Sequence, residues 1–440
     1  MILLSLLVPI AHAITDYDWY TYNKNFLRQG NTTSDTYPVV NDILWTFNCT
    51  GSYYQLANVL CVDDIVYSIG INTTTIHSIY NKTYAIYLLN GTEKWNASTG
   101  GSDDGATYYE NETGKYLFIQ ICGFLNPDEK KLICLNASTG SFIWNFSTPP
   151  GYNGSSGEED GGNPVVIEEE NLVITNGCGV VYAVNMTTGT EVWNRTIGKT
   201  GWADSAVTYL NSSDGNKYVY VCSDDNLTCF NASTGKVIWY NKTVAPLFVS
   251  PMIANETVFI GDTNFYAFNA TKGNLLFKKI LLATMTSSAS YDSVTNSILF
   301  GCDGKFYCIN ATTGDTIWLL LLSSYSTPAI SNGYVYFASE STEKLYCYNI
   351  TTGTEVWNIN IINIGFGYGA MTIYKNILLF CASNYNLYAI GSINDQIKVT
   401  GDIITVNVLS TLESVIGIIF MFITISLLLG LIVYFKLKGA

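Results

Sequence analysis

The sequence predicts an all-β fold: an eight-bladed β-propeller closed by an N-terminal strand, followed by one C-terminal transmembrane α-helix. Three observations support this prediction. A short turn-and-strand motif recurs along most of the 440 residues. Its period matches the length of one four-stranded blade. A single uncharged apolar run of membrane-spanning length lies near the C-terminus.

The repeated motif is clearest at residues 231–239, where Asn-Ala-Ser-Thr-Gly is followed by Lys-Val-Ile-Trp. Asn tolerates left-handed backbone geometry, and Gly supplies a positive φ, so this segment predicts a turn. An apolar triplet precedes the turn and an apolar strand follows it, which is typical of a hairpin. Successive motif aromatics lie about 38–50 residues apart. They are Trp45, Trp95, Trp144, Trp193, Trp239, Phe277, Trp318 and Trp357.

The two ends of this series predict how the ring closes. The strand that carries Trp45 has no triplet before it, and the triplet at residues 388–390 has no Trp strand after it. Pairing these two segments completes an eighth blade and removes a free strand edge. We therefore expect the propeller to span residues 38–392.

Each blade is expected to begin with an inner strand of small residues beside a crowded central channel, as at 204–207, 250–253, 327–330 and 369–372. Residues just before the inner strands should line one mouth of the channel. In the first three complete blades these residues are acidic, which makes them candidates for binding Ca²⁺ or a cationic ligand, although solvated acidic loops are the simpler interpretation. The candidates are Asp103, Asp104, Glu158, Glu159, Asp160 and Asp204.

The Thr-Gly turn followed by Trp resembles the repeat of the PQQ-like (quinoprotein-like) β-propellers, over roughly residues 17–392. Asp18-Trp19, with Gly30 downstream, is similar to the lead-in found before such propellers. The chain departs from the pattern in having Asn instead of the usual Asp, and Phe277 instead of Trp. The resemblance implies that the motif aromatics dock between blades.

The same resemblance bears on cofactors. Dehydrogenases of this family hold the quinone beneath a disulfide between adjacent cysteines, and this chain has no adjacent pair. We therefore expect neither PQQ nor another cofactor, with Ca²⁺ the one ion that the acidic residues suggest. Other catalysis has little support, because the chain has only His12 and His77. Paired carboxylates such as Asp104 and Asp204 leave hydrolysis open.

Charge and the two termini indicate location. A net charge of −14 disfavours nucleic acid as a partner. Residues 1–13 resemble a signal peptide, and 14–37 form a lead-in to the propeller. We expect a stalk at 393–414, a transmembrane helix at 415–435, and a cytoplasmic tail at 436–440 that contains two lysines. The chain would then be a single-pass protein of the cell surface.

Asn-x-Ser/Thr sequons are abundant, with about twenty in the chain, and they favour a glycoprotein of an archaeal envelope. Several coincide with repeat turns, where Asn also has a structural reason to be present. Glycosylation candidates are Asn31, Asn48, Asn72, Asn81, Asn111, Asn211, Asn241 and Asn255.

Eleven cysteines show no zinc spacing. Cys222 and Cys229 are expected to face each other across a two-residue turn, and Cys122 and Cys134 also flank a hairpin turn, so both pairs are candidate disulfides. Alternatively, Cys134 and Cys229 occupy a slot that Ala fills in other blades, where free Cys behaves as a small hydrophobe. Because the count is odd, at least one thiol is free or intermolecular.

These observations favour a non-catalytic scaffold or binding module of the cell envelope, whose partner is an envelope protein or a surface glycan. The resemblance extends to the propeller that scaffolds outer-membrane protein assembly in bacteria. Two alternatives stay open. One is an extracellular enzyme that uses the acidic mouth, either quinone-dependent or acting on polysaccharide. The other is a recognition subunit that stacks a sugar or peptide on Tyr325 and Tyr368.

Overall fold

A computed structural model describes most of the propeller region. The described residues are 18–32, 37–48, 58–70, 82–100, 102, 105–121, 130–148, 161–177, 179–197, 205–223, 226–243, 249–361, 369–382, 384 and 386–392. The chain divides into the units Met1–Ser392 and Ile393–Ala440. The predicted signal peptide, stalk, transmembrane helix and tail lie outside the described residues. Among the residues that are described, no helix has the length and apolar character needed to cross a membrane.

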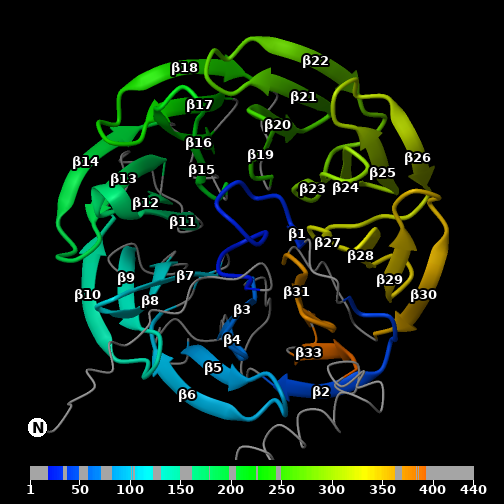
Figure 1. Ribbon diagram of the computed structural model, residues 1–440, viewed down its shortest axis with the longest axis horizontal. Coiled ribbons are helices and arrows are strands. Elements are labelled where there is room, and N and C mark those ends of the chain that lie inside the picture. The colour runs from blue at the N-terminus through cyan, green and yellow to red at the C-terminus, as the bar shows by residue number, and fades with distance from the viewer. Residues whose placement is uncertain are drawn as a thin grey trace, which may run out of the picture. The chain divides into compact units, whose positions relative to one another are not determined.

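The first unit is an eight-bladed β-propeller, as the sequence predicts (Figure 1). Blade 1 consists of β3 (Leu60–Val62), β4 (Ile65–Gly70), β5 (Lys82–Tyr87) and β6 (Glu93–Ser98), and blade 2 of β7 (Ala106–Asn111), β8 (Gly114–Ile121), β9 (Lys131–Asn136) and β10 (Phe142–Ser147). Blade 3 consists of β11 (Gly161–Ile167), β12 (Leu172–Gly177), β13 (Val180–Asn185) and β14 (Glu191–Thr196), and blade 4 of β15 (Thr208–Asn211), β16 (Lys217–Ser223), β17 (Asn226–Asn231) and β18 (Val237–Lys242). One 3₁₀ turn, η3 (Glu168–Glu170), links β11 to β12.

Blades 5 to 8 continue the same order from the inner to the outer strand. Blade 5 consists of β19 (Met252–Ala254), β20 (Thr257–Gly261), β21 (Asn264–Asn269) and β22 (Leu275–Ile280), and blade 6 of β23 (Ser290–Asp292), β24 (Ser297–Cys302), β25 (Lys305–Asn310) and β26 (Thr316–Leu320). Blade 7 consists of β27 (Ala329–Ser331), β28 (Tyr334–Ser339), β29 (Lys344–Asn349) and β30 (Glu355–Asn360), and blade 8 of β31 (Thr372–Tyr374), β32 (Ile377–Cys381), β33 (Asn386–Gly391) and β2 (Ile43–Asn48). A two-residue strand, β1 (Asn31–Thr32), adds to blade 7 in parallel with β27.

The ring closes where the sequence predicts. Strand β2 pairs antiparallel with β33, and Trp45 lies opposite Ala389. The eighth blade therefore combines three C-terminal strands with one N-terminal strand. Closing the ring in this way holds the two ends of the propeller together through backbone hydrogen bonds.

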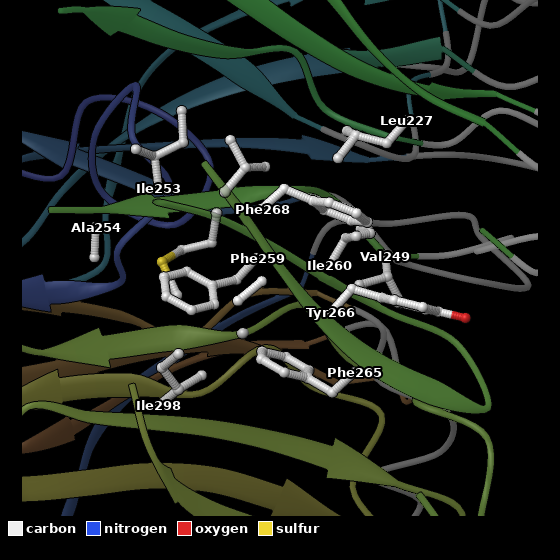
Figure 2. Close-up of a cluster of buried hydrophobic side chains, with 14 of the residues drawn as sticks. Leu227, Val249, Ile253, Ala254, Phe259, Ile260, Phe265, Tyr266, Phe268 and Ile298 are labelled. Atoms are coloured by element: carbon white, nitrogen blue, oxygen red, sulfur yellow. The ribbon is translucent and has the colours of Figure 1, made fainter. Parts of the chain in front are cut away.

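The hydrophobic core lies between neighbouring blades. The second and third strands of each blade are buried on both faces, whereas the outermost strands are partly exposed. Figure 2 shows one of these clusters, in which Phe259, Phe265 and Tyr266 of blade 5 lie near Ile298 of blade 6. Phe265 stacks on Phe300 of blade 6 with ring centroids 4.8 Å apart. Apolar burial between blades is thus the main stabilising term of the ring.

The repeated turn works as its residues suggest. At residues 231–235, the Asn231 side-chain oxygen accepts a hydrogen bond from the Thr234 backbone N–H. Gly235 has a φ of +65°, and a Cβ there would lie 2.5 Å from the Trp193 indole of the preceding blade. This position therefore needs Gly both for its backbone conformation and for the close approach of the ring.

The motif tryptophans lie between blades, and their indole N–H groups bind the next blade. In blade 4, Trp239 donates to the Ala270 carbonyl of blade 5 at 2.8 Å. The same bond recurs for Trp45, Trp95, Trp144, Trp193, Trp318 and Trp357, which donate to the carbonyls of Leu88, Ala137, Met186, Ala232, Ile350 and Pro38. Phe277 stacks on Gly314 in the corresponding place but has no N–H to donate.

Candidate functional site

The central channel is surrounded by small polar residues that precede the inner strands. Their hydrogen bonds run from blade to blade. The backbone N–H of Ala206 donates to Ser250 Oγ, that of Ser250 donates to Ser288 Oγ, and that of Ser288 donates to Thr327 Oγ1. These bonds fix the inner ends of blades 4 to 7 around the axis. Close packing continues at Gly162, where a Cβ would lie 2.0 Å from the Ser205 carbonyl oxygen.

The lead-in segment 18–32 lies inside this channel, a segment that we call the plug (dark blue at the centre of Figure 1). Its backbone carbonyls accept hydrogen bonds from inner-strand or adjacent N–H groups of six blades. Trp19, Tyr20, Phe26, Leu27, Gln29 and Gly30 accept from Cys61, Tyr108, Tyr209, Ile253, Tyr291 and Ile330. The plug therefore satisfies inner-edge donors that would otherwise be left unpaired in the channel.

Arg28 is the main side-chain link between the plug and the blades. Its side chain is fully buried, at 0% exposure. Its Nε and Nη2 donate to the Val207 carbonyl at 3.0 and 2.6 Å, and its Nη1 donates to the Tyr22 carbonyl at 2.9 Å. A third backbone carbonyl, that of Asn163, accepts from Nη2 at 3.2 Å. The guanidinium thus joins the plug to blades 3 and 4 through charge-assisted hydrogen bonds.

Tyr22 lies in the channel at the level of Ser250, Ser288 and Thr327, whose blade-to-blade hydrogen bonds form what we call the polar ring. It packs with Ala206 of blade 4 and Ala370 of blade 8, which lie on opposite sides of the ring. Its hydroxyl hydrogen-bonds Thr327 Oγ1 of blade 7 at 2.8 Å. A single side chain therefore spans the channel, so this level of the propeller is a packed core.

Burial in this region suppresses ionisation. The pKa of Tyr20 is raised to about 12, mainly by burial, with the positive charge of Arg28 acting in the opposite direction. Burial also raises the pKa of the Cys61 thiol, which lies beside the plug at Trp19. These groups are therefore neutral at physiological pH and supply no nucleophile or base.

The predicted acidic mouth falls outside the described residues. This holds for Asp103, Asp104, Glu158, Glu159, Asp160 and Asp204, and also for Tyr368. Tyr325 is described, and its backbone N–H donates to Glu340 Oε1 at 3.3 Å. Within the ranges that the structure describes, no group of three or more His, Cys, Asp or Glu side chains could hold a metal ion.

Side chains of the described residues fill the channel at the level of the polar ring, where Tyr22 packs with residues of blades 4 and 8 and Arg28 directs its N–H groups to backbone carbonyls. The adjacent-cysteine disulfide of the quinoprotein dehydrogenases has no counterpart in the sequence. The predicted channel mouth lies outside the described residues, so the expected absence of PQQ stays a prediction.

The structure corrects the expectation for Cys222 and Cys229. Cys222 lies opposite Leu227, and Cys229 lies opposite Tyr220, so the two cysteines are diagonal neighbours. Diagonal side chains in an antiparallel pair are too far apart for a disulfide. Both thiols are free and buried, and Cys134 is free as well, whereas Cys122 lies outside the described residues. The prediction misplaced the register of this hairpin by two residues.

The glycosylation candidates differ in their surroundings. Asn48, Asn211 and Asn255 are exposed. The side-chain amide of Asn241 donates to the Gly273 carbonyl at 2.6 Å, and that of Asn31 lies 3.4 Å from Asp292 beside the channel. Asn111 is partly buried at the end of β7, and Asn72 and Asn81 lie outside the described residues.

One surface feature was not predicted from the sequence. The outer strands of three consecutive blades expose large apolar side chains, a surface that we call the apolar edge. It comprises Val237, Ile238 and Tyr240 of β18, Leu275, Leu276 and Ile280 of β22 with Leu282 beyond it, and Ile317 and Leu319 of β26 with Leu321 beyond it. By contrast, β14, β30 and β2 each expose one such residue, Val192, Val356 and Ile43, and β10 exposes two, Phe142 and Ile143.

Comparison with known proteins agrees with this fold. A family profile described as outer membrane protein assembly factor BamB matches residues 87–196, 177–363 and 303–392, which together cover more than half of the chain. Tetrathionate hydrolase of Acidithiobacillus ferrooxidans is 27% identical over 121 residues. That match covers 26% of this chain and 20% of the hydrolase, so it spans about a fifth of the relative's length.

Solved structures share the architecture at low sequence identity. Quinohemoprotein alcohol dehydrogenase from Comamonas testosteroni has a TM-score of 0.66 and 12% identity, covering 85% of this chain and 81% of that one. BamB from Moraxella catarrhalis has a TM-score of 0.55 and 14% identity, covering 80% of this chain and 100% of that one. These likenesses concern the fold alone. Taken with the family profile, they place the chain in the PQQ-like β-propeller family.

Proposed function

We propose that this protein is a non-catalytic, protein-binding scaffold of the cell envelope. The apolar edge is the observation that carries the proposal. Ile280, Leu282 and Leu321 are 73%, 82% and 81% exposed, and they belong to neighbouring blades. Concentrated exposure of this kind, absent from β14 and β30, is typical of a surface that another protein covers.

The backbone of β22 suggests the form of the partner. This strand is the last of its sheet, so its outer edge has unpaired N–H and C=O groups. An extended segment could add to that edge, with its apolar side chains against Leu275 and Ile280. Lys278 and Lys279 interrupt the apolar residues of β22, which guards against self-aggregation and favours a partner segment that carries carboxylates.

Membership in a family whose profile is described as an assembly factor supports a scaffold role. The packing in the described part of the channel gives further support, because Tyr22 contacts Ala206 and Ala370 from blades on opposite sides of the ring. Anchoring through residues 415–435, glycosylation of the exposed sequons, and Ca²⁺ at the acidic residues remain parts of the proposal that need their own tests.

The test is a purification of the full chain from its own membranes, comparing the natural sequence with the double variant Leu275→Lys/Ile280→Lys. We expect a stoichiometric envelope protein to co-purify with the natural sequence and to be lost from the double variant. Val192→Lys, which adds a charge on the exposed edge of blade 3, is the matched control and should retain the partner.

Two results would count against the proposal. A partner retained equally by all three proteins would not depend on the apolar edge. A bound quinone or ion that disappears when Asp104 and Asp204 are changed to Ala would instead favour an enzyme or ligand-binding protein that uses the acidic mouth.

A further inference from the structure

The junction between blades 5 and 6 differs from the other seven, because Phe277 replaces the usual Trp. At the preceding junction, the Ala270 carbonyl accepts two hydrogen bonds, from Trp239 Nε1 at 2.8 Å and from the Tyr220 hydroxyl at 3.1 Å. The Ala137 and Pro38 carbonyls likewise each accept from one Trp and one Tyr. A Trp donor is present at every junction except that of Phe277.

The phenol donor is missing at this junction as well, as it is in the four blades where Phe118, Ile174, Leu299 and Leu379 take the place of Tyr220. Tyr220 lies opposite Cys229, which lies opposite Trp239, and the corresponding series in blade 5 is Phe259, Ala267 and Phe277. Phe259 therefore occupies the place of Tyr220 but has no hydroxyl. The acceptor that corresponds to Ala270 is Ala311, so its carbonyl receives neither the indole nor the phenol donor.

A cavity of about 240 Å³ occupies this place. Phe259, Phe277 and Leu276 form its apolar walls, and Ala311, Asn255 and Asn296 also line it. The volume is below the roughly 300 Å³ at which pockets for drug-sized ligands begin, so it suits a single aromatic group. Leu276 connects the cavity to the apolar edge, and it is 55% exposed.

The rim of the cavity is held in place by hydrogen bonds. The Asn255 side-chain amide donates to the Tyr291 hydroxyl at 2.9 Å, and that hydroxyl donates to Asn296 Oδ1 at 3.2 Å. The Asn296 amide in turn donates to Thr312 Oγ1 at 2.9 Å. A rim fixed in this way costs little to order when a ligand binds.

We propose that this cavity binds a planar aromatic group that carries an N–H donor, of which indole is the simplest example. The ring would stack against Phe277 and Phe259, and its N–H would donate a hydrogen bond to the Ala311 carbonyl. The bound ligand would thereby make the same contact that a Trp side chain of the protein makes at the other junctions. Two sources have this chemistry, namely a free indole compound and a Trp side chain of a bound polypeptide. The proposal does not depend on the scaffold function.

The experiment is a calorimetric titration of the full chain with three probes: indole, 1-methylindole and N-acetyltryptophanamide. Indole should bind with a stoichiometry of one, and 1-methylindole, which lacks the N–H, should bind about fivefold to tenfold more weakly. Preference for N-acetyltryptophanamide over indole would identify a polypeptide side chain as the source, and the reverse preference would identify a small molecule.

Phe277→Trp is the decisive variant, because its own indole should fill the cavity and abolish indole binding. Thermal unfolding of the variant checks that it is folded. Indole that binds the natural chain and Phe277→Trp equally, or that does not bind the natural chain at millimolar concentration, would overturn the proposal. Equal affinity for indole and 1-methylindole would also overturn it, because the Ala311 carbonyl would then have no role. This comparison uses the natural sequence, so the test does not depend on a variant that folds.

Discussion

Replacement of Arg28 tests whether the plug stabilises the ring. Arg28→Ala removes the printed donors of two buried carbonyls, those of Val207 and Tyr22, whereas the Asn163 carbonyl keeps a hydrogen bond from the Val207 backbone N–H. A buried acceptor without a partner costs about 1–3 kcal/mol, and relief of the cost of burying the guanidinium offsets part of that sum. We therefore expect the free energy of unfolding to fall by about 3–5 kcal/mol, in the range found when one member of a buried charged network is removed.

The assay is equilibrium unfolding of the full chain in urea, followed by tryptophan fluorescence. A loss of stability should lower the transition midpoint while the slope is unchanged. Arg195→Ala is a matched control, because Arg195 donates to the Gly235 and Thr234 carbonyls but is exposed. Water can replace those donors, so we expect a change below about 0.5 kcal/mol.

A loss below about 1 kcal/mol for Arg28→Ala would refute this reasoning. So would a biphasic transition in which the propeller keeps its original midpoint while the plug is released at lower urea. Either outcome would mean that the ring is stable without the plug and that residues 18–32 merely occupy the channel.

Three further predictions concern other regions. Phe277→Trp should raise the free energy of unfolding by about 1 kcal/mol through the new hydrogen bond, and a lower urea midpoint would contradict the proposed cavity. Cys222 and Cys229 should react with a thiol reagent only after unfolding, because burial raises the pKa of Cys222 to about 12; a disulfide between them in a non-reducing peptide map would show that the register is wrong. The pKa of Glu256 is lowered, mainly by a hydrogen bond from the Ser213 backbone N–H. A lowered folded-state pKa gives stability that is present above about pH 4.5 and lost as the pH falls through the folded value. The stability difference between the natural chain and Glu256→Gln should therefore shrink in acid, and a constant difference from pH 7 to 3 would exclude this role.

The propeller was predictable because its repeat carries several independent signals in one short stretch. Three signals predict the same four-stranded blade: the Asn and Gly of the turn, the Trp strand after it, and the period of the aromatics. The unmatched strand around Trp45 then predicted the closure with β33, since a lone half of a hairpin has one available partner in a ring. Local turn chemistry and strand count determine these features, and both can be read along the chain.

The hairpin of Cys222 and Cys229 shows the limit of such reading. Whether two cysteines meet depends on which residues form the turn, and a shift of two residues separates the thiols while leaving both on the same face. The alternation of apolar residues is unchanged by that shift, so the sequence pattern does not distinguish the two registers. Only the ladder itself, with Cys222 opposite Leu227, decides between them.

The Phe277 cavity could not be predicted for a different reason, because it depends on comparing equivalent positions in different blades. Phe277 reads as a conservative aromatic replacement until the Ala311 carbonyl is set beside Ala270, whose two donors are Trp239 and Tyr220. Because both donors are missing at this junction, the Ala311 carbonyl and the cavity lie together there. A simple weakening of the repeat motif at Phe277 would not produce that combination. Because the blades are nearly identical, the other seven junctions serve as the standard for comparison. The junction between blades 5 and 6 is the one without a Trp donor, so a ligand should first be sought there.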